Sequence, residues 1–291
     1  MKIKKHLALL LALCLAAAPL ASCDKGNTNT PDGTEAPTVA VTTPETDAAE
    51  DSSDEAEETT IEPETQSPSS TQLYFYSHFP GVCTIYGCGK QLDSEFVIPS
   101  VSPEGDTVTA IEDRVFAYDK HITSVTIPDC VSSIGGYAFH QSASLKTVTI
   151  SGYGATIGSN AFSGCPVLTD VTILDGVYFI SSAAFSGCDA LTNVTISDSV
   201  MEIGERAFAS CSSLENLVIG KGVTKIDRLA FSDSKKIAAV YYTGSEEEWA
   251  TIYIGYRNNN LTDAPRYYYS ETQPAEAGNY WHYVDGVPTK W

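Results

Sequence analysis

The sequence predicts a repeat solenoid that is mostly β, with short helical turns, and that is capped at both ends. Two sets of apolar residues recur every 23 positions in this chain of 291 residues. Six phenylalanines share one position: Phe116, Phe139, Phe162, Phe185, Phe208 and Phe231. Six isoleucines share another: Ile111, Ile134, Ile157, Ile180, Ile203 and Ile226. A fixed period of this length indicates stacked units, because each unit buries its apolar side only against its neighbours.

Residues 1–22 have the features of a secretion signal. Three lysines precede an apolar run that is too short to span a membrane. The run ends in Leu20-Ala-Ser-Cys23, which resembles a bacterial lipobox, where a peptidase cuts before a cysteine that carries lipid. We therefore predict that Cys23 is lipidated and that its acyl chains anchor the protein. The alternative is an ordinary cleaved signal followed by a coincidental cysteine.

Residues 23–71 are predicted to be the lipidated cysteine and a disordered acidic tether. Residues 24–70 hold 13 acidic residues against one lysine and contain no aromatic residue. Such a segment cannot bury enough apolar surface to offset its conformational entropy. An acidic binding segment is the alternative. The formal net charge of −20 argues against nucleic acid as a partner, because phosphate recognition needs a basic surface.

The composition changes at residue 72, and residues 72–98 are predicted to be an N-terminal cap. Three short strands are expected at 73–76, 83–86 and 95–99, since β-branched and aromatic residues there are separated by turn residues. Cys83 and Cys88 leave a disulfide open as a possibility, although their five-residue separation makes the geometry uncertain.

Residues 99–243 are predicted to be the repeats. Val194 and Ile196 alternate with polar residues and indicate a strand with one buried face. The following Asp198-Ser199 favours a turn. The closing Ala207-Phe208 segment is too short for a full helix and is expected to be a helical turn. Phe162, in an inner repeat, is expected to be fully enclosed.

Residues 244–291 are aromatic-rich and contain all three tryptophans of the chain, which predicts a C-terminal cap over the last repeat. Ser245 and Glu248 form a capping-box pattern that starts a short helix. Residues 280–287 indicate a hairpin that turns at Asp285-Gly286. A carbohydrate site built on stacked aromatic side chains is the alternative interpretation.

A strip of polar residues is predicted on the exposed face of the repeat strands. It offers hydroxyls and amides that suit a glycan or an extended protein segment, although the strand propensity of threonine alone also explains the ladder. Its candidate binding residues are Thr126, Thr149, Thr172, Thr195, Asp170 and Asn193.

A second candidate site is aromatic. Tyr178 and Phe179 occupy positions that hold mostly small or charged residues in other repeats, so at least one of them is expected to face solvent. Exposed aromatic side chains are frequent interface anchors, and Tyr153 in the preceding loop could extend the surface. The alternative is that they pack against that irregular loop.

Cys165, Cys188 and Cys211 share one repeat position, where Ser142 and Ser234 stand in flanking repeats. A small buried residue explains this ladder better than metal or redox chemistry. The histidines are scattered, and no spacing indicates a catalytic triad. We therefore predict no enzyme activity, no metal and no cofactor.

The segments Val125-Thr-Ile-Pro-Asp-Cys-Val-Ser-Ser-Ile-Gly-Gly-Tyr-Ala-Phe139 and Ala184-Phe-Ser-Gly-Cys-Asp-Ala-Leu191 resemble the BspA-type leucine-rich repeats of bacterial surface proteins. The resemblance implies a curved solenoid with one strand per turn on its concave side and no shared catalytic residues. Some members of that family are adhesins for host matrix proteins.

These features together predict a protein at the bacterial cell surface or secreted, held in the membrane by its lipid alone. Its expected partner is a protein of a host or neighbouring cell, a matrix protein or a glycan, with envelope scaffolding as the alternative.

Overall fold

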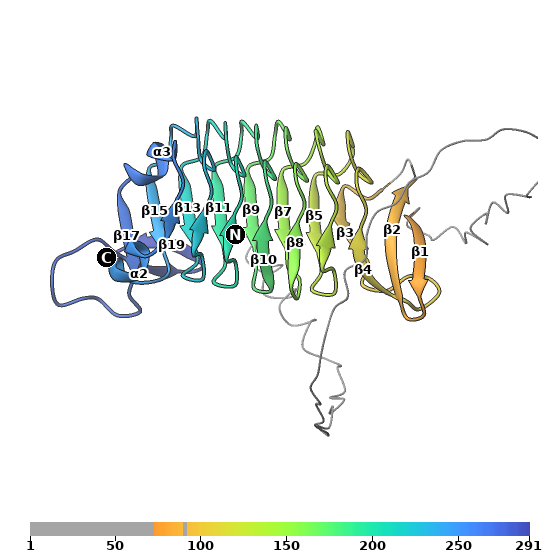
Figure 1. The fold of residues 1–291 in the computed structure, drawn as a ribbon, viewed down its shortest axis with the longest axis horizontal. Coiled ribbons are helices and arrows are strands. Elements are labelled where there is room, and N and C mark those ends of the chain that lie inside the picture. The colour runs from red at the N-terminus through yellow and green to blue at the C-terminus, as the bar shows by residue number, and fades with distance from the viewer. Residues whose placement is uncertain (1–72, 90–91) are drawn as a thin grey trace, which may run out of the picture. The chain divides into compact units, whose positions relative to one another are not determined.

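The computed structural model describes residues 73–89 and 92–291, which form a β-solenoid (Figure 1). The predicted signal, the tether and the lipidation at Cys23 lie outside the described residues. Each 23-residue coil contributes one strand to each of two sheets, called sheet A and sheet B below. The fold predicted from the repeat period is confirmed.

Sheet B carries the Val-Thr-Ile strands, which alternate buried and half-buried residues. Its order along the solenoid is β3 (Glu95–Val97), β5 (Ser124–Ile127), β7 (Thr147–Ile150), β9 (Asp170–Ile173), β11 (Asn193–Ile196), β13 (Asn216–Ile219), β15 (Ala239–Tyr242), β17 (Arg266–Tyr269), β18 (Tyr280–Val284) and β19 (Val287–Lys290).

Sheet A is built largely from very short strands around the period's isoleucines. Its order is β1 (Leu73–Phe79), β2 (Val82–Cys88), β4 (Thr107–Ile111), β6 (Ser133–Ile134), β8 (Ala155–Ile157), β10 (Val177–Ile180), β12 (Glu202–Ile203), β14 (Lys225–Ile226) and β16 (Tyr253–Ile254).

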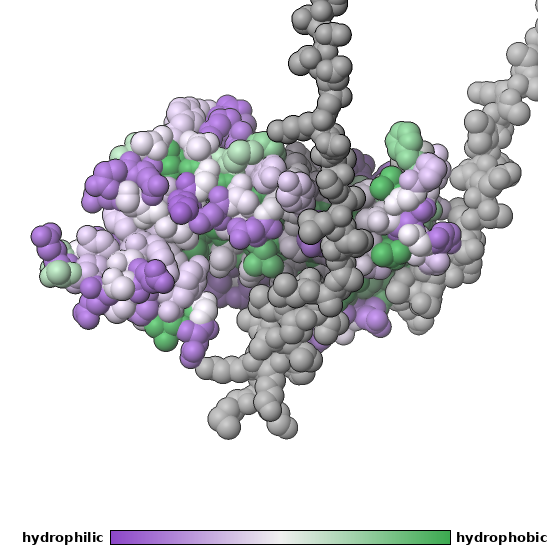
Figure 2. Space-filling model, turned by 90° about the horizontal axis from the view of Figure 1, so that it is seen from below, coloured by the Kyte–Doolittle hydropathy of each residue, from purple (hydrophilic) through white to green (hydrophobic). Residues whose placement is uncertain are grey.

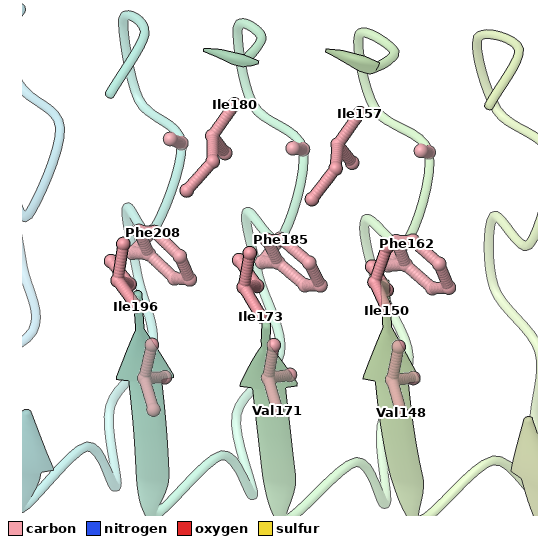
Figure 3. Packing of buried hydrophobic residues seen from close by; sticks show 14 of the residues in the cluster. Val148, Ile150, Ile157, Phe162, Val171, Ile173, Ile180, Phe185, Ile196 and Phe208 are labelled. Atoms are coloured by element: carbon pink, nitrogen blue, oxygen red, sulfur yellow. The ribbon is translucent and has the colours of Figure 1, made fainter. Parts of the chain in front are cut away.

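Neighbouring repeat strands run parallel, and their pairing preserves the 23-residue period. In sheet B, for example, Val148 pairs with Val171 and Ile150 with Ile173. Equivalent residues of successive coils therefore lie side by side, and their buried side chains form rows between the sheets (Figure 3). Phe162 is fully buried, as predicted, and its ring stacks on that of Phe185 with centroids 5.1 Å apart.

The Ala-Phe segments close each coil with turns rather than with an α-helix. Ala161 N donates to the carbonyl of Gly158, and Ser163 N donates to that of Asn160. Asn160 adopts a positive φ of 58°, which reverses the chain between these two turns. Phe162 N then donates to Ala184 O of the next coil at 2.7 Å, so backbone hydrogen bonds link adjacent coils on this side too.

At the N-terminal end, β1 and β2 form an antiparallel hairpin, and β2 also pairs in parallel with β4. The three predicted strands of this segment are present as β1, β2 and β3. Cys83 and Cys88 both lie within β2 and are free thiols. A disulfide between them does not fit, because five residues of extended strand separate their Cα atoms by about 16 Å.

At the C-terminal end, helix α2 (Glu246–Ala250) begins with the predicted capping box between Ser245 and Glu248. Helix α3 (Asn259–Thr262) follows, and the predicted hairpin is the pair β18–β19, with Asp285 and Gly286 at its turn. None of the helices in residues 73–89 and 92–291 has the length and hydrophobicity required to cross a membrane.

Candidate functional site

The predicted threonine strip lies on the outer face of sheet B. Thr126, Thr149, Thr172 and Thr195 are Cα partners in consecutive strands, and each is partly exposed. The two positions that follow in the strip hold Val218 and Tyr241, which are buried. The polar strip therefore ends where an apolar surface begins.

A chain of side-chain hydrogen bonds runs beside the threonines. Asn216 Nδ2 donates to Asn193 Oδ1 at 2.9 Å, and Asn193 Nδ2 donates to Asp170 Oδ1 at 2.7 Å. The amide of Asn193 also lies 3.1 Å from Thr192 Oγ1. The Asp170 carboxylate is the final acceptor, so this Asp-Asn-Asn ladder holds its three side chains in fixed orientations above β9, β11 and β13.

The β18–β19 hairpin covers the apolar end of the strip. Trp281 is 0% exposed and packs with Val218, Ala239 and Tyr241 in a cluster separate from the main core. Its indole Nε1 donates to the carbonyl of Tyr242 at 2.9 Å, which fixes the hairpin on the sheet. Packing, as expected for a cap, accounts for the buried Trp281.

The tip of this hairpin and the ladder enclose a groove of about 380 Å³. Its floor is formed by β9, β11 and β13, with Thr172 and Thr195 beside the Asp-Asn-Asn ladder. Gly286, Val287 and Pro288 of the hairpin line the same groove. We call this feature the sheet B groove. It brings together the predicted residues Asp170, Thr172, Asn193 and Thr195, whereas Thr126 and Thr149 lie outside it on the same face.

The predicted aromatic residues do not form one surface. Between Val177 and Phe179 the pairing of β10 with β8 shifts by one residue, and Tyr178 is the extra residue. Tyr178 lines a hollow of about 460 Å³ with Tyr153, and Phe179 lines a different one beside Thr156. Phe179 is 40% exposed and Tyr153 is 83% exposed, which agrees with the expectation that an aromatic residue here faces solvent.

Close backbone contacts position the hollow shared by Tyr153 and Tyr178. Ala155 N donates to Gly176 O at 3.0 Å. A Cβ on Gly176 would lie only 1.9 Å from Gly152 O, and the φ of Gly176 is 101°, so glycine is required at this contact. Asp129 and Asp175 complete the lining. On the face seen in Figure 2, hydrophobic residues are scattered among hydrophilic ones.

Comparison with known protein families decides what the repeats are. The BspA type leucine rich repeat region matches residues 109–238 in six copies. Residues 109–238 are thus similar to BspA-type leucine-rich repeats. The 23-residue period and the mostly β architecture agree with this family, and such repeat proteins are typically binding or scaffold proteins.

Solved structures of other leucine-rich-repeat proteins are similar to this chain at low identity. One is a leucine rich repeat protein of T. pallidum, with 24% identity over 60% of this chain and 71% of that chain and a TM-score of 0.43. A leucine-rich repeat protein from Bacteroides capillosus has 24% identity over 60% and 97%, with a TM-score of 0.30. A leucine rich cell surface protein from Faecalibacterium prausnitzii has 19% identity over 64% and 97%, with a TM-score of 0.27. None of the curated protein sequences compared with the chain matches it.

Within the repeats, the cysteine ladder has a specific structural role. The thiols of Cys165, Cys188 and Cys211 donate to the carbonyls of Phe139, Phe162 and Phe185 at 3.2–3.3 Å. The hydroxyls of Ser142 and Ser234 donate to Phe116 and Phe208 in the same way. The position therefore requires a small hydrogen-bond donor, a requirement that small size alone did not reveal.

Burial changes the acidity of these thiols. It raises the pKa of Cys211 to about 12, because an anion there would lose its hydration. Hydrogen bonding with Cys165 and burial both raise the pKa of Cys188 well above its usual value. Thiols of this kind are poor nucleophiles and poor metal ligands at neutral pH. In the described residues, no three His, Cys, Asp or Glu side chains are grouped to hold a metal ion.

One serine–histidine contact escaped the sequence analysis. His140 Nδ1 lies 2.7 Å from Ser163 Oγ, one repeat away. Ser163 is buried, and its hydroxyl also donates to Asn160 O at 3.0 Å. The pair thus binds two coils together and offers no exposed nucleophile. The shared 23-residue period of the two positions is the signal that could have revealed it.

Proposed function

We propose that this chain is a lipid-anchored cell-surface protein whose repeats bind a protein or glycan in an adhesin-like manner. The single observation that carries the proposal is the sheet B groove, where fixed amide, carboxylate and hydroxyl groups lie beside an apolar hairpin wall. Polar groups held in place lose little conformational entropy on binding, which favours affinity. The fold alone does not define a ligand.

The N-terminal sequence supports a surface location. A lysine-rich start, an apolar run and Cys23 follow the order of a lipoprotein signal. The acidic segment after Cys23 would act as a tether, with a root-mean-square span of about 35–40 Å if it behaves as a flexible coil. Growth with a labelled fatty acid tests the anchor. The label should appear on the wild type and be absent from Cys23→Ala, and equal labelling of both would contradict lipidation.

Binding itself is tested with the full chain displayed on cells, against immobilised matrix proteins and a glycan array. Saturable binding of a ligand to cells that display the wild-type chain, but not to cells that express Cys23→Ala, would support the proposal. The Tyr178→Ser, Phe179→Thr double variant tests the two aromatic hollows in the same assay. If no ligand binds and the purified chain instead self-associates with rising concentration, the alternative of an envelope scaffold replaces the adhesin.

A further inference from the structure

The Asp-Asn-Asn ladder leaves hydrogen-bonding groups directed to the groove. Asn216 Nδ2 donates once, to Asn193 Oδ1, whereas Asn193 Nδ2 donates to both Asp170 Oδ1 and Thr192 Oγ1. Within the described residues, no protein hydrogen bond occupies Asp170 Oδ2 or Asn216 Oδ1. An amide and a carboxylate side by side offer both donors and acceptors. A pair of neighbouring sugar hydroxyls, each of which donates and accepts, is complementary to that set.

The spacing of these groups along the solenoid indicates which kind of polymer can bind in the groove. Asp170, Asn193 and Asn216 occupy one register position in adjacent strands, as do Thr172 and Thr195. Equivalent groups therefore repeat along the solenoid at about 4.8 Å. A pyranose ring in an extended β-1,4-linked chain advances by nearly the same length. Side chains on one face of an extended peptide repeat at about 6.8 Å, which does not match.

The structure of the floor of the sheet B groove also disfavours the binding of an extended peptide. Extended peptides commonly bind by adding a strand to a sheet edge, where backbone groups are unpaired. The groove instead presents the face of sheet B, where β11 pairs with β9 on one side and with β13 on the other. Recognition here depends on side chains alone.

The charge and shape of the groove further restrict the class of ligand that it can bind. Its lining contains one carboxylate, Asp170, and no lysine or arginine, so an anionic polysaccharide would meet no compensating charge. Val287, which is 61% exposed, and Pro288 form an apolar wall that can contact the C–H face of a sugar ring. The volume of about 380 Å³ is within the range of small-ligand sites.

We propose that the sheet B groove binds a neutral, extended β-linked oligosaccharide along the solenoid axis. Asn216 donates to and accepts from the hydroxyls of one ring, and Asn193 accepts from the next ring through Oδ1. Asp170 accepts from a ring at one end, and the hairpin tip covers the apolar ring faces. This inference rests on the proposed binding function and narrows its ligand class.

The test uses the full chain, purified in a detergent without a sugar headgroup, and isothermal calorimetry with defined tetrasaccharides. The probes are cellotetraose and chitotetraose as neutral β-1,4 chains, maltotetraose as a neutral α-1,4 chain and a heparin tetrasaccharide as an anionic chain. We expect a β-1,4 probe to bind and the heparin probe not to bind. The Asn193→Ala, Asn216→Ala double variant should weaken the bound probe at least tenfold, and so should Val287→Asp on the opposite wall.

The matched control is Asn259→Ala, which makes the same chemical change at an exposed position of α3 outside the groove. It should bind like the wild type, and circular dichroism should show equal melting temperatures for all variants. Equal binding by the double variant and the wild type would overturn the assigned site. Binding to a matrix protein without binding to any β-1,4 probe would overturn the glycan inference and leave the proposed function standing. No binding in either assay would overturn both.

Discussion

The thiol of Cys188 donates a 3.2 Å hydrogen bond to the carbonyl oxygen of Phe162, one coil earlier in the solenoid. Both residues are fully buried. A buried carbonyl without a partner loses its hydration without compensation. This contact therefore explains why serine and cysteine, but not alanine, occupy the position in the repeats that follow Phe116 through Phe208.

The first prediction compares two substitutions at this position. Cys188→Ser should keep the hydrogen bond, because the hydroxyl of Ser234 makes the equivalent bond at 2.7 Å. Cys188→Ala should cost about 1–3 kcal/mol of unfolding free energy, since the Phe162 carbonyl loses its donor. Urea unfolding of both variants measures the difference. If the two variants were equally stable, side-chain size and not hydrogen bonding would explain the ladder.

The second prediction concerns pH. The pKa of Cys211 is raised to about 12 in the folded protein, from an ordinary thiol value of 9.0. Between these pH values the folded state holds a proton that the unfolded state has lost, so stability is complete below about pH 9 and falls as pH rises toward about 12. Unfolding free energy measured across this range should decline less steeply in Cys211→Ser than in the wild type, by at most about 1.4 kcal/mol per pH unit. Parallel curves would contradict a buried, protonated thiol.

The third prediction tests the phenylalanine stack. Phe162→Ala should destabilise the solenoid by about 3–5 kcal/mol, because it opens a cavity between the rings of Phe139 and Phe185. Phe179→Ala is the matched control, since it removes the same atoms from a side chain that is 40% exposed. Denaturant unfolding should show a much smaller loss for the control. A comparable loss in both variants would mean that the stack contributes no more than a surface ring.

The fourth prediction concerns the hairpin that walls the groove. Trp281→Ala should release β18 and β19 from the sheet, because the indole fills the cluster with Val218 and Tyr241 and donates to Tyr242 O. Hydrogen exchange should accelerate in residues 280–290 and stay slow in the repeats, since solenoid stability depends mainly on neighbouring coils. Tyr153→Ala, at an aromatic side chain that is 83% exposed and lies outside the hairpin, should leave exchange in residues 280–290 slow. Uniform acceleration along the chain would show that the hairpin supports the whole solenoid.

The strands and the core followed from the sequence, because the period places Ile150, Ile173 and Ile196 at one register position and alternation assigns them to the buried face. The polar strip followed from the same argument. The groove could not be predicted from the sequence, because Val287 is far from β11 along the chain. Its position over β11 depends on how Trp281 packs. The replacement of threonine by Val218 and Tyr241 was the available signal that something covers the strip there.

Two local irregularities of the backbone also could not be predicted from the 23-residue pattern. The extra residue Tyr178 in β10 separates two aromatic side chains that a strict period would place as direct neighbours in the strand. Asn160, with its positive φ, separates two short turns in the segment that was expected to be a helical turn because it is too short for a full helix. Both features arise from backbone geometry, which hydrophobic spacing does not encode.

Because equivalent coils stack in register, the length of the solenoid depends directly on the number of coils. Inserting or deleting one whole 23-residue unit ahead of β9 would change the length of the solenoid by one strand spacing, about 4.8 Å, while every remaining contact kept its partner type. The hairpin would still cover the same final coils. The distance between the groove and the N-terminal end can therefore vary in discrete steps among relatives, without any redesign of the residues that line the groove.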